Sequence, residues 1–216
     1  MNAKSRRRVH KEQLRGEILE AARDIFVREG YEQFSMRKLA KRIDYSPASL
    51  YLHFRNKQAL FDCLVEESFA RLLQTLTRLR DGHQSPDPAR ELKRGLWAYV
   101  NFGLRHPNHY RFAFMLRPPA TRRPYQVHGA FEALRYMVGR CIEAKRFRAV
   151  DVETTAQALW ASVHGVTCLL IQRPNFPWVA RKNLITQVID AAVDGLLATP
   201  ESTVEAGEPH ASLTRA

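Results

Sequence analysis

In the sequence YSPASLYLHFRNK, residues 45–57, the second and third residues favour a helix start. A serine such as Ser46 caps free backbone N–H groups, and Pro47 suits the first helical position, where a backbone N–H is not needed. Leu50 and Phe54 lie four residues apart, so they share one face of the helix, which we expect to be buried. The other residues are mostly small or polar, which indicates a short helix with an exposed face for binding.

Two helices are expected before this one. Apolar residues recur at three- and four-residue steps from Leu14 to Phe26, which predicts a helix that begins at Glu12 and stops at Gly30, a left-handed C-cap. Ser35 can cap a second helix of about eight residues. A short turn at Asp44 and Tyr45 then leads to the helix that Ser46 caps, and Asn56 can cap a further helix that begins at Lys57. Two short helices so joined form a helix-turn-helix, whose second member is expected in the major groove of DNA.

The charge of the chain favours a polyanionic partner. Its 216 residues carry a net charge of +12, with a pI of about 10.1, and 45% of them are hydrophobic, which is typical of a globular protein. Residues 1–11 contain five basic residues and no acidic one. We interpret them as a flexible basic arm, which is either a solvated tail or a segment that contacts phosphates or the minor groove of DNA.

The pattern over residues 12–70 resembles the TetR family of bacterial transcriptional regulators. The residues that carry the resemblance are ILEAARDIFVREGYEQFSMRKLAKRIDYSPASLYLHFRNKQALF, residues 18–61. One departure is Asp44, at a turn position where such proteins usually have glycine; aspartate tolerates the left-handed conformation better than most residues. The stretch ALWASVHGVTCLL, residues 158–170, resembles a Trp-x-x-x-His-Gly helix found in one subgroup.

Nine residues are expected to contact DNA. Ser49 and Arg37 can bond to base edges, and Pro47 with Ala48 can contact a thymine methyl group. His53 follows Ser49 by four residues and points the same way. The resemblance adds phosphate contacts for three others. The full set is Ser35, Arg37, Ser46, Pro47, Ala48, Ser49, Tyr51, His53 and Lys57. For Ser35 a plain helix cap, and for Arg37 a solvated surface position, are the alternatives.

The rest of the chain also has helical periodicity, so the fold class is all-α with about nine helices. With the resemblance, five segments are expected. They are a basic arm at residues 1–11, a helix-turn-helix domain at 12–56, a connecting helix at 57–80, a ligand-binding and dimerisation domain at 81–198 and a disordered tail at 199–216.

The larger C-terminal segment is rich in aromatic residues, which suits either a core or an apolar pocket between helices. The resemblance favours a pocket for a small, largely apolar effector. The candidate lining residues are Trp97, Phe102, Tyr110, Phe114, Phe131, Met137, Trp160 and His164. For His164 a hydrogen-bonded core position is the alternative.

The resemblance also implies a homodimer built on the last two long helices, residues 151–172 and 178–198. The candidate interface residues are Trp160, Val163, Thr167, Leu170, Ile189 and Val193. A two-fold dimer matches a palindromic operator with half-sites ~34–36 Å apart.

Other classes of protein fit the sequence less well. Cys63, Cys141 and Cys168 are odd in number and far apart, so neither a disulfide framework nor a zinc site is expected. There is no apolar run long enough for a membrane span, no signal peptide and no Gly-rich phosphate loop or catalytic elbow. We therefore expect a cytoplasmic DNA-binding repressor without cofactor or enzymatic activity. A basic helical protein that binds nucleic acid non-specifically, without an effector, is the alternative.

Overall fold

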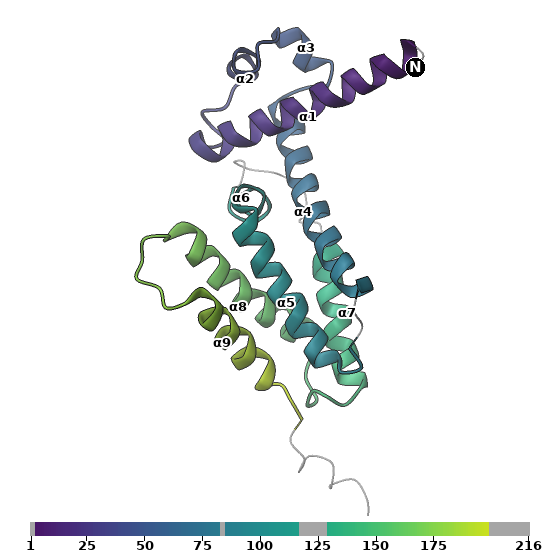
Figure 1. Ribbon diagram of the computed structural model, residues 1–216, viewed down its shortest axis with the longest axis vertical. Helices are drawn as coiled ribbons and strands as arrows, with labels where there is room; N and C mark the ends of the chain where they lie inside the picture. The colour runs from purple at the N-terminus through teal and green to yellow at the C-terminus, as the bar shows by residue number, and fades with distance from the viewer. Residues whose placement is uncertain (1–2, 83–84, 117–128, 199–216) are drawn as a thin grey trace, which may run out of the picture.

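The computed structural model describes residues 3–82, 85–116 and 129–198, and within these ranges it is all-α, as predicted. The described helices are α1 (Ala3–Glu29), α2 (Met36–Arg42), α3 (Pro47–Tyr51), α4 (Lys57–Gly82), α5 (Pro88–Arg105), α6 (Pro107–Phe114), α7 (Gly129–Glu143), α8 (Val152–Gln172) and α9 (Arg181–Asp194). Figure 1 shows α1, α2 and α3 at one end, with α4 leading from them to the bundle of α5–α9. An isolated bridge joins Phe147 to Leu197.

The helix starts and stops near α2 and α3 follow from local chemistry. Gly30 has φ of +81° and ends α1 in the left-handed conformation. The side-chain oxygens of Ser35 and Ser46 accept hydrogen bonds from the backbone N–H groups of Lys38 (3.1 Å) and Ser49 (3.2 Å). Asp44 has φ of 57°, so the turn before α3 keeps its left-handed residue without a glycine. These features confirm the predicted helix-turn-helix.

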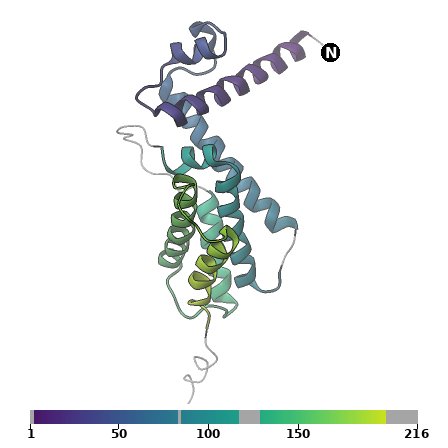
Figure 2. The same ribbon diagram turned by 60° about the vertical axis from the view of Figure 1, so that its left-hand side comes forward.

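The beginning of the chain differs from the prediction. Helix α1 starts at Ala3 rather than at Glu12, so residues 3–11 are the first turns of α1 and not a flexible arm. These residues contain no glycine or proline, and alanine, lysine and arginine all favour helix, which explains the extension. Figure 2 shows this end of α1 projecting away from the bundle. Residues 1–2 and the predicted tail at 199–216 lie outside the described residues.

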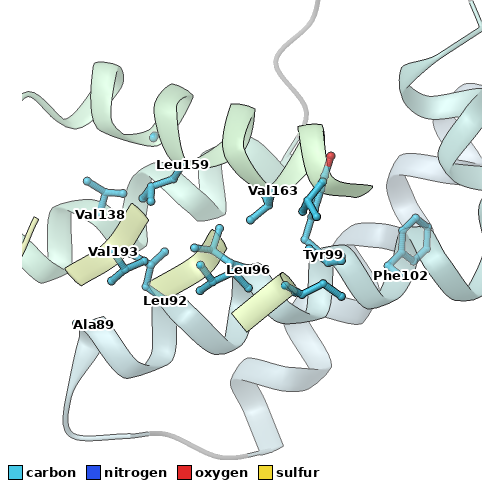
Figure 3. Packing of buried hydrophobic residues seen from close by; sticks show 14 of the residues in the cluster. Ala89, Leu92, Leu96, Tyr99, Phe102, Val138, Leu159, Val163 and Val193 are labelled. Atoms are coloured by element: carbon cyan, nitrogen blue, oxygen red, sulfur yellow. The ribbon is translucent and has the colours of Figure 1, made fainter. Parts of the chain in front are cut away.

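Helix α5 is the centre of the C-terminal bundle, because it packs against α4, α6, α7, α8 and α9. Figure 3 shows side chains of α5 directed at those of α7, α8 and α9; the labelled residues of this core include Leu92, Leu96, Tyr99, Val138, Leu159, Val163 and Val193. Helix α9 begins at Arg181, three residues after the predicted start at residue 178. No helix in the described ranges is long and apolar enough to span a lipid bilayer.

Two apolar cores share α4 and α6. Leu60, Phe61 and Leu64 of α4 are buried in the N-terminal core, whereas Leu72, three turns further on, belongs to the C-terminal core. In the same way, α6 contributes Phe112 to the N-terminal core and Tyr110 to the C-terminal one. The two halves of the molecule are therefore joined by packed side chains and not only by the chain.

Candidate functional site

The tip of α3 presents small and polar groups to solvent. Ser46, Pro47 and Ala48 are exposed, and Ser49 is half-buried. The hydroxyl oxygens of Ser46 and Ser49 lie 2.9 Å apart, so the two side chains form one hydrogen-bonding pair at the helix start. A rigid helix end that offers hydroxyl groups beside apolar atoms can meet both base edges and methyl groups in a major groove.

Two larger side chains flank this tip. Tyr51 is 52% exposed, which excludes the core position that a tyrosine often takes. The ammonium group of Lys57 lies 4.1 Å from the ring centroid of Tyr31 and 3.4 Å from the carbonyl oxygen of Glu32, so it is held at the first turn of α4. Both groups are placed where they can donate hydrogen bonds to phosphates. The neighbouring Leu52 is 81% exposed and was not singled out from the sequence.

Helix α2 adds two further candidates. Arg37 is exposed on the first turn of α2, as expected. The Ser35 hydroxyl is exposed while it caps α2, so its role as a cap leaves room for a phosphate contact at the same helix start. The adjacent Lys38 is ion-paired with Glu29 of α1.

His53 lies where the start of α1 approaches the end of α3. Burial lowers the pKa of His53, and the positive charges of Lys11 and Arg15 lower it further. The Arg15 guanidinium also lies 5.1 Å from the ring centroid of Phe54. Both effects favour the neutral imidazole, which has one N–H donor for a phosphate or a base and one acceptor nitrogen for a base. These contacts place basic residues of α1 beside the helix-turn-helix.

The C-terminal bundle contains a cavity of about 1100 Å³ between α4, α5, α7 and α8, with one wall residue from α6. Its lining is largely apolar. Four of the predicted pocket residues are in that lining: Phe114, Phe131, Met137 and Trp160. The contribution of α4 to the wall, which includes Leu72, Leu73 and Leu76, was not predicted from the sequence. Their helical spacing was visible, but the spacing alone does not separate a core from a cavity wall.

The other four predicted pocket residues lie outside the cavity lining. Trp97 packs against the C-terminal core, Phe102 is 2% exposed with its ring near His106, and Tyr110 is completely buried. His164 is half-buried among aromatic rings. The wall of this cavity thus differs from the predicted one at these four positions, and their contact with a ligand stays a prediction.

His164 instead belongs to a hydrogen-bonded chain within the core. The Trp160 indole N–H donates to the Tyr99 hydroxyl (3.1 Å), which lies 3.0 Å from the Tyr110 hydroxyl. The Tyr110 hydroxyl is 2.6 Å from Nδ1 of His164, and Nε2 of His164 is 3.2 Å from the Sγ atom of Cys168. Burial lowers the pKa of His164, which keeps the ring neutral and able to accept at one nitrogen. The structure therefore supports the alternative interpretation of His164, a hydrogen-bonded position in the core.

One carboxylate in the cavity wall was not predicted. Glu91 of α5 lines the cavity, and its side chain is 9% exposed. The Oε2 atom lies 3.5 Å from Nη1 of Arg140, whereas the buried Oε1 atom has no hydrogen-bond partner among the described residues. From the sequence alone, Glu91 reads as an acidic residue in a first helical turn, which the helix dipole stabilises without any further role.

The predicted dimer residues face the interior of the single chain. Val163, Thr167, Leu170, Ile189 and Val193 are between 0% and 3% exposed, and Trp160 lines the cavity. Figure 3 shows Val163 and Val193 directed at the side chains of α5. Fully buried side chains cannot contact a second protomer, so this set is corrected. Large apolar side chains that are exposed in the same region are Leu169 (50%), Phe176 (56%) and Val179 (65%).

A polar cluster lies between the two halves of the molecule. Arg23 of α1 is ion-paired with Glu67 of α4 at 2.8 Å. Nearby, Nδ1 of His109 in α6 lies 3.3 Å from the hydroxyl oxygen of Ser68, which donates to the carbonyl oxygen of Leu64. His109 is 7% exposed. Burial, aided by the positive charges of Arg23, Arg71 and His106, lowers the pKa of His109 to about 4.

This low pKa predicts a loss of stability in acid. In the unfolded chain the pKa of His109 returns to its ordinary value near 6.5, so below that pH the unfolded state binds a proton that the folded state does not. The free energy of unfolding should fall as the pH drops from about 6.5 to about 4, with up to about 3 kcal/mol due to this residue. Urea titrations of the wild type and of His109→Gln across this pH range measure how much of the change in the free energy of unfolding is due to His109. Parallel pH profiles for the two proteins would contradict the assignment.

Comparisons with known proteins agree with this architecture. A family model described as "Bacterial regulatory proteins, tetR family" matches residues 18–64, and one described as "Tetracyclin repressor-like, C-terminal domain" matches residues 93–196. Among solved structures, a protein of unknown function from Rhodococcus sp. RHA1 has a TM-score of 0.73 at 25% identity, and the match covers 86% of this chain and 96% of that one. A regulatory protein of the tetR family from Rhodococcus RHA1 has a TM-score of 0.65 at 17% identity, with 86% and 97% of the two chains covered.

Curated relatives match over shorter stretches of the chain. The transcriptional repressor AcnR of Corynebacterium efficiens is 38% identical over 63 residues, and the class A tetracycline repressor from an Escherichia coli transposon is 42% identical over 53 residues. The matches span 29% and 24% of this chain, and only 34% and 24% of those two proteins. The two family models, by contrast, extend over both halves of the molecule described above. This chain belongs to the tetR family of bacterial regulatory proteins, which are DNA-binding regulators of transcription.

Proposed function

We propose that this protein is a repressor that binds a palindromic operator as a homodimer and is released by a small, largely apolar ligand in the cavity. The observation that carries the proposal is the sharing of two helices by the cavity and the DNA-binding core. Phe114 of α6 is in the cavity wall, and Phe112, two residues earlier, is buried beside Phe26 of α1. A change in the shape of the cavity can therefore be transmitted through packed side chains to the helix-turn-helix.

The proposed mechanism needs two states that the ligand binds with different affinity. In the operator-binding state the two heads of a dimer present their α3 helices at the spacing of successive major grooves, ~34–36 Å. A ligand between α4 and α7 moves α4 and α6 together with the core residues that they carry. The heads then no longer fit the two half-sites at the same time, and the protein leaves the operator.

The homodimer is proposed to form through the exposed side of α8 and α9 and the segment between them. Leu169, Phe176 and Val179 expose apolar surface there, with Trp178 partly buried beside Phe176 at a ring distance of 4.4 Å. Large apolar side chains gathered on one face of a folded chain are typical of a protein interface. This set replaces the buried residues predicted from the sequence.

Selection of random DNA duplexes by the purified protein at ~150 mM salt, followed by sequencing, tests the proposal. Enrichment of a palindrome, with two protomers bound per site, is the expected result. Equal recovery of all sequences, with binding that is lost as the salt concentration rises, would instead show the non-specific nucleic-acid binder. Apolar compounds that release the enriched operator then test the role of the cavity.

Replacing Lys57 with alanine should weaken DNA binding almost equally for all sequences. If its ammonium group meets a phosphate, its loss lowers the slope of log Kd against log salt concentration by about 1 for each protomer bound. Fluorescence anisotropy with the selected operator, at several salt concentrations, measures this slope. Arg90→Ala, which removes an equal charge from an exposed position on α5, outside the proposed interface, is the matched control and should leave the slope nearly unchanged. Equal slopes for the two variants would refute the contact.

A further inference from the structure

The wall of the cavity contains an ionisable group whose hydrogen bonding is incomplete. Glu91 is nine-tenths buried, and its Oε1 atom has no hydrogen-bond partner among the described residues. A carboxylate accepts hydrogen bonds at both oxygens, and a buried oxygen without a donor destabilises the protein. Because the terminal torsion of a glutamate is soft, a small rotation can turn either oxygen toward the cavity. The Oε1 atom of Glu91, which lacks a donor, can therefore accept a hydrogen bond from a ligand in the cavity.

Arg140 does not supply the missing hydrogen-bond donor to the Oε1 atom of Glu91. Arg140 approaches only the other oxygen of Glu91, at 3.5 Å, and its side chain is 41% exposed. Such a contact is longer than a strong charge-assisted hydrogen bond. The position of Glu91 in the first turn of α5 lets the helix dipole stabilise its charge, which explains how the carboxylate is tolerated without a full set of donors.

A second carboxylate in the same wall provides a comparison. Glu153 of α8 also lines the cavity, but it is 46% exposed and its Oε2 atom lies 2.8 Å from Nε of Arg135. Glu153 is thus both exposed to solvent and ion-paired with Arg135. Of these two cavity carboxylates, Glu91 is the one that gains from a donor brought by a ligand.

We propose that the cavity selects apolar molecules that carry a hydrogen-bond donor, an amine or a hydroxyl group, and that Glu91 accepts this hydrogen bond. The inference rests on the proposed binding of an apolar ligand and adds the chemistry of its polar end. A ligand with a carboxylate at that end would place a second negative charge beside Glu91 and is disfavoured. Among the described residues of the wall, the side chains of Tyr99 and Trp160 are hydrogen-bonded to each other, so neither has an unpaired polar atom like Oε1 of Glu91.

Four probes with the same apolar chain test this selectivity by calorimetry on the full-length protein. They are decylamine, decanol, decyltrimethylammonium and decanoate. Decylamine and decanol should both bind more tightly than decanoate, and decylamine by about tenfold or more, as for a hydrogen bond to a charged group. The net charge of +12 favours decanoate in any non-specific binding, so this order cannot arise from the overall charge.

The variant Glu91→Gln should reduce the ratio between decylamine and decanoate affinities to near unity, whereas Glu153→Gln should keep the wild-type ratio. Thermal melts show that both variants are folded. Unchanged selectivity in Glu91→Gln, or an equal loss in Glu153→Gln, would overturn the role of Glu91. Tight decyltrimethylammonium binding with weak decanol binding would show that charge and not a donor is recognised, and would also overturn it.

The same panel separates this inference from the function on which it rests. If the four probes bind the wild type with equal affinity, the cavity takes apolar ligands but Glu91 does not select among them. If none of the four binds saturably, the proposed apolar ligand site itself fails, and the inference fails with it.

Discussion

Replacing Phe112 with alanine is expected to lower the free energy of unfolding of the N-terminal helices by about 3–5 kcal/mol. Phe112 is completely buried, and its ring centroid lies 5.1 Å from that of Phe61 and 5.6 Å from that of Phe26. Removing the ring leaves a cavity among aromatic side chains that are already stacked on one another and can move little to fill it. Urea unfolding followed by circular dichroism measures the change.

A control and a milder variant separate stability from signalling. Phe176→Ala removes a ring that is 56% exposed in the single chain, so it should change the free energy of unfolding of the monomer by much less. Phe112→Leu should fold and bind the operator, yet require more ligand for release, because its looser packing follows the movement of α6 less well. A loss below about 1 kcal/mol in Phe112→Ala would contradict the buried position.

Replacing Leu169 with glutamate is expected to give monomers and to weaken operator binding by about a hundredfold or more. Leu169 is 50% exposed on α8, and the exposed Phe176 and Val179 of the following segment complete the proposed interface. A dimer would bury the new carboxylate, and its partner, against apolar surface without a counter-charge. A monomer can occupy only one half-site, so it loses the affinity that two linked contacts provide.

Analytical ultracentrifugation gives the mass, and anisotropy with the selected operator gives the affinity. Tyr136→Glu introduces the same charge at a residue that is 62% exposed on α7, outside the proposed interface, and should stay dimeric. A dimeric Leu169→Glu variant with full operator affinity would place the interface elsewhere. Dissociation of both variants would show that the added charge acts in some other way than through this face.

The helix-turn-helix was predictable because its geometry depends on neighbouring residues. Ser35 and Ser46 cap the helices that directly follow them, and Gly30 and Asp44 adopt the left-handed turns that their side chains allow. Each of these features needs only a few consecutive residues. The same short range explains the error at the start of α1, where only the absence of a helix breaker distinguished a helix from an arm.

The cavity and the interface depend on distant residues, and the sequence predicted them poorly. In α8, Leu169 is half-exposed and Leu170 is buried, yet both are apolar residues in an apolar helix. Periodicity predicts which residues share a face of a helix, but it does not tell whether that face packs against the same chain or against a partner. Likewise, Tyr110 and Trp160 are both aromatic, and only their packing places one inside the core and the other in the cavity wall.

The shared helix α6 has a consequence for domain exchange between regulators. A hybrid made by joining the first 56 residues of one relative to the remainder of another would take Phe112 from the wrong parent, since this ring fills the N-terminal core from a distant part of the chain. The aromatic contact with Phe26, which comes from the other parent, would then have to re-form with an unmatched side chain. Transplanting the residue at position 112 together with the head should restore the ligand response, whereas a cut chosen by sequence position alone should yield hybrids that bind DNA but no longer respond.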